Sequence, residues 1–262
     1  MLELKILEIK TAIDMHQFAR YSSVLVAKGM SLMRIGEKPE IARLPPFRDM
    51  DEAMRDRVLS GSFLQVFPPQ LTLFELGQQA DFLHVLVDGL IELYVSGTGR
   101  DTTMKIVEPV ASFILAAVIT DLPYLMSART LTSSRVLLVP AALMREVIRK
   151  DTALMQASMH ELALGYRDMV RALTDMKLRQ SAERLANHLL EFSAQRGNAW
   201  EFELSGEKRV LASLLGMTPE NLSRAFGTLK LHGVSVNGAR VRIEERGALT
   251  ALARPDPVPA DR

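Results

Sequence analysis

The apolar residues change their spacing near residue 140, and this change limits the fold more than any other feature of the sequence. Between Phe63 and Pro140, short apolar runs alternate with turn residues. The runs span residues 63–67, 71–76, 82–87, 90–95 and 135–139. Many short strands at such close spacing predict an antiparallel barrel or sandwich. After Pro140 the spacing becomes helical, so we expect an α+β chain in which the strands come first and the helices follow.

Two stretches fit more than one assignment. Residues 112–119 are continuously apolar, and a run of this length fits either a strand or a short buried helix. Residues 1–40 mix charged and apolar side chains. They fit either a docking arm or an extension from an early start codon, with Met30 and Met33 as later starts, and we assign them no role.

The composition indicates a folded globular protein of two domains. The chain has 262 residues, of which 48% are hydrophobic and 24% charged, and its formal net charge is +1. It contains no cysteine, which excludes disulfides, cysteine-held zinc, iron–sulfur clusters and a cysteine nucleophile. The longest uncharged run, 109–120, is shorter than the roughly 20 residues that cross a bilayer. Residues 1–10 lack a signal-peptide pattern, so we expect a cytoplasmic protein with no membrane partner.

A long helix is predicted from about residue 151 to Arg179, after a short helix over 141–150. Along it, apolar and small residues recur at alternating steps of three and four, as in a heptad repeat. The members of this predicted seam are Met155, Ser158, Leu162, Gly165, Met169, Ala172 and Met176. Such a seam packs either on the chain's own barrel or on a second copy, and the small residues favour a parallel pair, hence a homodimer. The predicted domains are 41–150, the dimer helix 151–180, and 181–262.

The C-terminal domain carries the strongest local signals. Ser181 and Ser205 are predicted to cap two helices. Thr218-Pro219 supplies a hydroxyl N-cap followed by proline at the first helical position, where the missing N–H costs nothing. A further helix therefore begins there, separated from the preceding one by a short turn at Gly216. This order of elements predicts a helix-turn-helix.

A hairpin is predicted directly after this helix. Valines alternate around Asn237-Gly238, which predicts a type I′ turn and completes a winged helix-turn-helix. Residues 204–243 hold six Lys and Arg against two Glu, in a chain of net charge +1. This concentration of positive charge indicates binding to double-stranded DNA. The residues expected to contact the DNA backbone are Thr218, Lys230, Arg240 and Arg242.

The predicted second helix has one apolar and one polar side. Its apolar positions are Leu222, Ala225, Phe226 and Leu229. Glu220 and Arg224 lie opposite them, and at i and i+4 they would ordinarily be a surface ion pair. At the start of a recognition helix, arginine instead matches guanine and glutamate accepts from cytosine N4, so we expect both to contact bases.

Residues 211–224, which read Leu-Ala-Ser-Leu-Leu-Gly-Met-Thr-Pro-Glu-Asn-Leu-Ser-Arg, resemble the helix-turn-helix signature of the CRP/FNR superfamily of bacterial transcription regulators. The resemblance covers about residues 41–245, and upstream it rests on element order and on residues 86–94, which resemble the family's strand-Gly-strand hairpin. It implies a jelly-roll, cyclic-nucleotide-binding-like sensor domain before the long dimer helix. It also implies base contacts from Glu220, Ser223 and Arg224, TTGAT-like half-sites in a palindrome, and RNA polymerase as the partner of an activator.

The sensor domain departs from the nucleotide-binding members of this family. Those members hold the ribose and the cyclic phosphate with a Phe-Gly-Glu stretch and an Arg-Ser pair. Here residues 111–115 lack the glutamate, and Leu125-Met126 stand where Arg-Ser is expected. A buried phosphate needs a bidentate cation, so we do not expect a cyclic nucleotide.

An apolar pocket would instead suit heme, a fatty acid or another hydrophobic small molecule. The residues expected to line it are Phe113, Leu125, Met126 and Met169. His84 and His160 are the candidate axial ligands for heme, although a lone histidine is more often structural.

No catalytic motif is found, and we do not expect an enzyme: the sequence has no phosphate-binding glycine loop and no Gly-x-Ser-x-Gly. The alternative to a regulator is an interaction module, in which the barrel senses a lipid or heme and the winged domain serves only for packing.

Overall fold

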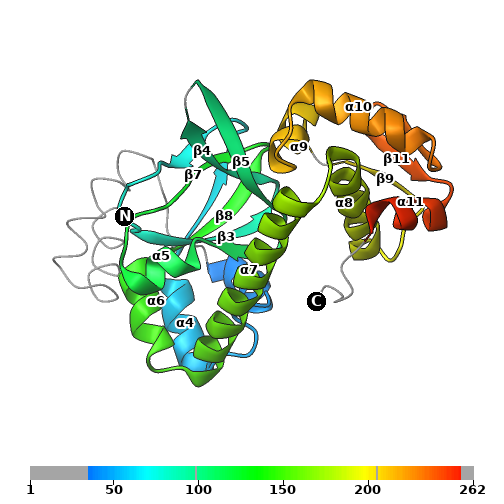
Figure 1. The fold of residues 1–262 in the computed structure, drawn as a ribbon. Coiled ribbons are helices and arrows are strands. Elements are labelled where there is room, and N and C mark those ends of the chain that lie inside the picture. Colours follow the sequence, from blue (N-terminus) through cyan, green and yellow to red (C-terminus); the bar gives the residue numbers. More distant parts are fainter. Residues whose placement is uncertain (1–34, 98, 205, 255–262) are drawn as a thin grey trace. The chain divides into compact units, whose positions relative to one another are not determined.

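The computed structural model describes residues 35–97, 99–204 and 206–254 (Figure 1). The chain divides into two compact units, and the division falls between Tyr166 and Arg167 within helix α7 (Thr152–Leu178), with residues 102–104 grouped with the second unit. Each unit has its own hydrophobic core. Residues 1–34, most of the N-terminal extension, lie outside the described residues.

The first unit is a β-roll made of two four-stranded antiparallel sheets, with strand orders β1-β8-β3-β6 and β2-β7-β4-β5. The strands are β1 (Phe63–Phe67), β2 (Thr72–Phe74), β3 (Phe82–Asp88), β4 (Ile91–Gly97), β5 (Arg100–Val107), β6 (Ala111–Phe113), β7 (Ser127–Thr130) and β8 (Ser134–Pro140). The predicted antiparallel architecture is confirmed. Strand β3 is central and buried along most of its length, because both of its neighbours and the roll interior cover it.

Short helices accompany the sheets (Figure 1). They are η1 (Ile35–Glu37), α3 (Lys38–Ala42), α4 (Glu52–Ser60), α5 (Leu115–Thr120) and α6 (Ala141–Ile148). The buried carboxylate of Asp151 joins two helix starts: it accepts from the Asp51 N–H, at the N-cap of α4, and from the Leu154 N–H, in the first turn of α7, both at 2.8 Å. The beginning of α7 is thereby fixed to the β-roll unit.

The apolar run 112–119 contains both of the structures considered for it. Strand β6 ends at Phe113 and helix α5 begins at Leu115, and the change of direction falls on Ile114 in the left-handed conformation, at φ 66°. Strands β5 and β7 carry no apolar run and were not predicted. Strand β5 is mostly exposed and polar, and β7 reads Ser-Ala-Arg-Thr, so their positions depend on pairing with β4.

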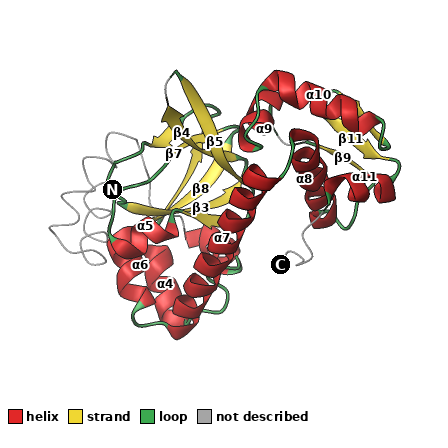
Figure 2. Cartoon of the chain, viewed as in Figure 1, coloured by secondary structure: helices red, strands yellow, loops and turns green. Residues whose placement is uncertain are grey.

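The second unit is a winged helix-turn-helix (Figure 2). It comprises α8 (Ser181–Gln195), β9 (Glu201–Glu203), α9 (Lys208–Leu214), α10 (Pro219–Lys230), β10 (Val234–Asn237), β11 (Arg240–Ile243) and α11 (Arg246–Ala253). The predicted N-cap at Ser181 is wrong by one residue: Gln180 caps α8 in a capping box with Glu183. The predicted cap Ser205 lies outside the described residues, and α9 begins at Lys208.

The wing hairpin forms where it was predicted, but its turn is shifted by one residue. Asn237 pairs with Arg240, so the two loop residues are Gly238 and Ala239 rather than Asn237 and Gly238. Positive φ occurs at Gly238 alone, as in a type II′ turn, whereas the predicted type I′ turn needs two such residues. A third strand, β9, pairs with β11 and was not predicted.

Helix α7 ends at Leu178, as predicted, but its exposed apolar seam differs from the predicted one at every second position. Met155, Leu162, Met169 and Met176 are exposed. Ser158 is only 5% exposed, because it faces the β-roll core together with Leu154. The exposed seam is Met155, Met159, Leu162, Tyr166, Met169, Leu173 and Met176. The heptad spacing is retained, and the small residues lie beside the seam rather than in it.

Two glycine-to-alanine substitutions should affect stability in opposite directions. Gly89, between β3 and β4, has φ +97°, and an added Cβ would lie 2.6 Å from the Ser133 carbonyl oxygen, so Gly89→Ala should destabilise by several kcal/mol or prevent folding. Gly165 is helical with open space around it, so Gly165→Ala should stabilise by up to about 1 kcal/mol. Thermal unfolding followed by circular dichroism measures both. If both substitutions changed the melting temperature equally, the different roles assigned to Gly89 and Gly165 would be wrong.

Candidate nucleic-acid interface and effector region

The start of α10 is fixed by the residues that the sequence singled out. Thr218 is the N-cap, and its Oγ accepts from the Asn221 N–H at 3.2 Å, with Pro219 at the first helical position. The turn before it is held by Arg184 of α8, which the sequence reasoning missed. Its guanidinium donates to the Leu215 carbonyl oxygen at 2.9 Å and to the Arg179 carbonyl oxygen at 2.6 Å. An arginine within an otherwise amphipathic helix gives no signal of this role in the sequence.

The two sides of α10 are separated as predicted. Leu222, Ala225, Phe226 and Leu229 are all buried in the core of the second unit. Glu220, Ser223 and Arg224 are exposed on the opposite side. Gly227 also lies there, and a Cβ at this position would meet nothing within 4 Å. The first two turns of α10 therefore present polar side chains that have no packing role in their own unit.

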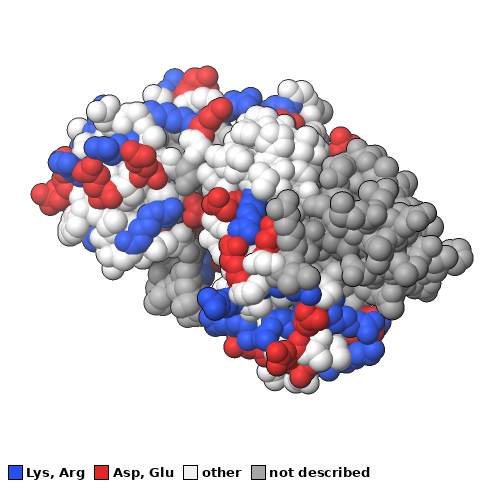
Figure 3. All heavy atoms as spheres, turned by 180° about the vertical axis from the view of Figure 1, so that it is seen from behind, with Lys and Arg blue, Asp and Glu red and all other residues white. Residues whose placement is uncertain are grey.

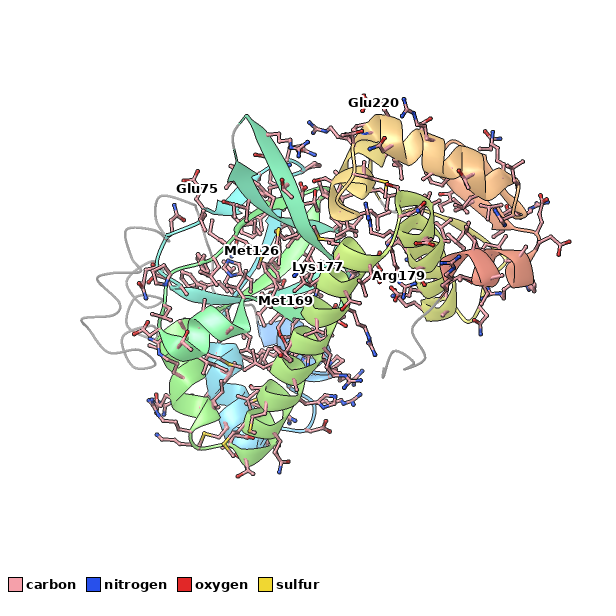
Figure 4. The ribbon with its side chains drawn as sticks, in the orientation of Figure 1. Glu75, Met126, Met169, Lys177, Arg179 and Glu220 are labelled. Atoms are coloured by element: carbon pink, nitrogen blue, oxygen red, sulfur yellow. The ribbon has the colours of Figure 1, made fainter. Side chains whose placement is uncertain are left out.

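Glu220 is held as a charged acceptor at the beginning of the helix. Figure 4 shows it in the first turn of α10, pointing away from the helix. Hydrogen bonds from its own backbone N–H and from the Thr218 hydroxyl, together with the nearby Arg224 charge, keep the pKa of the Glu220 carboxyl below its usual value. The group is therefore ionised at neutral pH, the form that accepts an amino proton from cytosine.

The wing does not offer two free cations. Arg242 forms an ion pair with Glu201 at 2.6 Å, and Arg240 lies 3.5 Å from Glu201 and 3.6 Å from Glu203. The charge count over residues 204–243 omitted these two carboxylates because β9 was not predicted. On the face drawn in Figure 3, cations and carboxylates are likewise interspersed.

Three other cations of the second unit are available. Arg209 on α9 and Arg224 and Lys230 on α10 are exposed, and within the described part of the chain they form no ion pair. Arg209 was counted in the predicted positive charge but was not among the predicted DNA-backbone contacts. Its place on the helix preceding α10 suits a contact with the DNA backbone, since the first helix of such a motif crosses the phosphates.

The interior of the β-roll is filled by a cluster of aromatic rings. His84 and Phe113 pair across β3 and β6, with ring centroids 5.3 Å apart. Phe74 stacks on Tyr124 at 4.0 Å and lies 4.9 Å from His84. The Tyr124 hydroxyl donates to the Phe82 carbonyl oxygen at 3.2 Å. All four rings are buried, so the structure unites two of the predicted effector-region residues, Phe113 and His84, in one packed cluster.

The other predicted effector-region residues are not among the stacked rings of this cluster. Leu125 is 79% exposed, and Met126 is half-buried against the β-roll core. Met169 is exposed on α7, in the other unit (Figure 4). His160 is exposed at the rim of an open groove of about 330 Å³, which is also lined by Pro45, Pro46 and Met50. Leu125 is therefore a surface residue among the residues that the structure describes.

The charges inside the sensor unit are unsuited to an anion. Arg129 is mostly buried, but it is bound to Glu92 and Asp101, each at 2.7 Å, and its guanidinium lies 4.3 Å from the Tyr94 ring centre. It lies on β7 next to Ala128, whose side chain enters the core, so Arg129 faces away from the roll interior. This cation is already neutralised and turned outward.

Glu161 brings a carboxyl group from α7 to strand β6 of the sensor unit. Its two oxygens accept from the Ser112 hydroxyl on β6, both at 2.5 Å. Burial raises the pKa of Glu161, while the Ser112 hydroxyl and the charge of Lys105 act in the opposite direction. Helix α7 thus places a potential negative charge against Ser112 of β6.

Two family models match this chain. Residues 64–151 match the cyclic nucleotide-binding domain, and residues 183–252 match the Crp-like helix-turn-helix domain, so together they cover more than half of the chain. The fumarate and nitrate reduction regulatory protein of Salmonella typhi is 29% identical over 196 residues, which are 70% of this chain and 75% of that protein.

Solved structures agree with the matches to these two family models. A suggested cAMP-binding regulatory protein from Silicibacter pomeroyi DSS-3 is 27% identical with a TM-score of 0.55, covering 85% of this chain and all of that one. FixK2 from Bradyrhizobium japonicum has the same fold, with a TM-score of 0.66 at 19% identity over 73% of this chain and 96% of its own.

The fold and the exposed helix define a winged helix-turn-helix DNA-binding regulator joined to a cyclic-nucleotide-binding-like domain. This chain belongs to the CRP/FNR superfamily of transcription regulators. Within the described residues, no helix is long and apolar enough to cross a membrane.

Glu161→Gln should change how stability depends on pH. The folded pKa of Glu161 lies above its ordinary value of 4.5, so ionising the buried carboxyl costs stability as pH rises from about 4.5 through the folded pKa. The wild type should lose stability relative to Glu161→Gln over this interval, and the difference should be constant above it. Urea unfolding at several pH values measures this.

Ser112→Ala provides the matched comparison for Glu161→Gln. It removes the hydrogen bond that favours the charged form, so it should raise the folded pKa further and extend the interval to higher pH. A stability difference between wild type and Glu161→Gln that does not vary with pH would contradict the buried position of this carboxyl.

Proposed function

We propose that this protein is a dimeric, sequence-specific transcription regulator that inserts α10 into the major groove. The observation that carries this proposal is the separation of α10 into a fully buried apolar side and an exposed polar start. Glu220, Ser223 and Arg224 would read base edges, with Arg224 donating to guanine and Glu220 accepting from cytosine. Thr218, Arg209 and Lys230 would contact phosphates. The resemblance of Glu220, Ser223 and Arg224 to the FNR-type recognition helix implies TTGAT-like half-sites.

The dimer would form through the exposed seam of α7. Seven apolar residues at alternating steps of four and three are what a parallel two-stranded coiled coil buries, and among the residues that the structure describes these seven stay exposed. Two-fold symmetry would place two copies of α10 about 34 Å apart, in successive major grooves of a palindromic site. RNA polymerase would be the further partner of an activator bound at such a site in the cytoplasm.

The effector proposed for the β-roll is an uncharged, apolar small molecule rather than a cyclic nucleotide. The interior is aromatic, and Arg129 is bound by two carboxylates and faces away from that interior, so it is not available to pair with a phosphate there. Heme would need His84 or His160 as a ligand. His84 is enclosed by Phe74 and Phe113, so iron could reach it only if this cluster opened, whereas His160 is exposed. The absorption and mass spectra of natively purified protein test this proposal.

Arg224→Ala and Lys230→Ala should weaken DNA binding in different ways. Arg224→Ala should cost about 1–3 kcal/mol on the selected site and relax the preference at one base position, because a bidentate base contact is lost. Lys230→Ala should weaken binding to all duplexes alike and lower the salt dependence. Fluorescence anisotropy on a selected palindrome and on scrambled DNA measures both.

The outcome that would contradict the role of Arg224 is an equal loss on specific and scrambled duplexes. If repeated selection from random sequences enriched no palindrome at any salt concentration, the winged domain would have a packing role and the interaction-module alternative would stand.

Leu173→Arg should separate the proposed dimer. It places a charge within the exposed seam, and a buried unpaired charge in a coiled-coil interface is costly. Val66→Arg is the matched control, since Val66 is also exposed, at 69% against 52% for Leu173, but lies on β1. Sedimentation equilibrium should show a monomer for Leu173→Arg and a dimer for wild type and Val66→Arg. A dimer of unchanged affinity in Leu173→Arg would exclude this seam.

A further inference from the structure

The solvent side of the wing sheet carries a ladder of opposite charges. In the register of β9 and β11, Arg240 lies opposite Glu203 and Arg242 lies opposite Glu201. Between them Val241 and Phe202 form the next pair and point into the core. Because side chains alternate along a strand, both arginines and both glutamates lie on the same exposed face.

The contacts on this face are close, yet they remain accessible to solvent. Arg242 reaches Glu201 through Nε at 2.8 Å and through a terminal nitrogen at 2.6 Å, and Arg240 lies between Glu201 and Glu203. Both arginine side chains are about 60% exposed. Exposed ion pairs contribute about 0–1 kcal/mol, so a phosphate could replace a carboxylate at either arginine.

These carboxylates are not needed to hold the sheet. Strand β9 pairs with β11 through its backbone, and Phe202 anchors it in the core next to Phe192 at 5.1 Å. Uncharged glutamine at positions 201 and 203 would preserve both interactions. The two arginines would then face no carboxylate from β9.

We propose that Glu201 and Glu203 restrain the sequence-independent affinity of this protein for DNA by occupying Arg240 and Arg242. The inference rests on the proposed DNA-binding function. To contact a phosphate, each arginine must leave its carboxylate, and the carboxylate then remains beside the phosphate and repels it. Contacts to phosphates supply nearly all non-specific binding, so the restraint acts on every sequence alike, while base reading by α10 is unaffected.

The double variant Glu201→Gln/Glu203→Gln tests this restraint. Binding to a selected palindrome and to a scrambled duplex is measured at several salt concentrations by fluorescence anisotropy. We expect both affinities to rise about two- to fivefold per subunit at low salt, which corresponds to release of exposed ion pairs. The plot of log affinity against log salt should steepen by about one for each added phosphate contact. The ratio of specific to scrambled affinity should stay the same.

Two further variants assign the effect to the arginines. In a background of Arg240→Gln/Arg242→Gln, the glutamate substitutions should leave both DNA affinities and the salt slope unchanged. This double-mutant cycle separates the release of the two arginines from the general effect of net charge. Glu75→Gln makes the same charge change at an exposed position of the first unit, away from the wing sheet, and should leave the slope unchanged. Circular dichroism melting checks folding. If the double variant unfolds, Glu203→Gln alone serves, since Glu203 is 70% exposed.

The outcomes separate the two proposals. Wild type that binds no duplex would overturn the proposed function and this inference together. Wild type that binds, with affinities and slopes unchanged in the double variant, would overturn the inference alone. A gain that persists in the arginine-free background would also overturn it, because the effect would then be net charge and not the release of Arg240 and Arg242.

Discussion

The packing of α10 on the core of its own unit decides which of its side chains are free to contact another molecule. Leu222, Ala225, Phe226 and Leu229 are withdrawn from solvent, and this burial orients the remaining positions outward. Arg184 adds a second constraint by binding the backbone of the turn that precedes α10. The base reading proposed for α10 would therefore depend on an apolar contact that involves none of Glu220, Ser223 and Arg224.

The side chains of the sensor unit are the basis for proposing which small molecules it could bind. A fold that accommodates cyclic nucleotides elsewhere has here an aromatic interior, a neutralised arginine and a buried acid on α7. The proposal of an uncharged effector rests on the aromatic interior and on the pairing of Arg129 with two carboxylates. The family match therefore establishes the architecture, whereas the class of effector is proposed from these side chains.

The features predictable from sequence were those set by local chemistry. Thr218-Pro219 begins α10, the two sides of α10 follow the helical period, and the long helix ends where its pattern ends. Features that depend on distant partners could not be predicted. The seam of α7 includes Met159 rather than Ser158, because the β-roll covers one side of the helix, and a heptad pattern does not show which side. Strand β9 is three residues long, and its glutamates meet the wing arginines only after folding.

The exposed cations of the helix-turn-helix and the paired arginines of the wing have different consequences for regulation. Effectors typically change affinity by about 1–3 kcal/mol, and such a change controls occupancy only where non-specific binding does not already retain the protein on DNA. The exposed Arg209, Arg224 and Lys230 supply attraction at the helix-turn-helix, while on the wing two arginines face two carboxylates. A wing with free arginines would add affinity on every sequence and so reduce the effect of any signal from the sensor. The paired wing therefore suits a protein whose DNA binding is conditional.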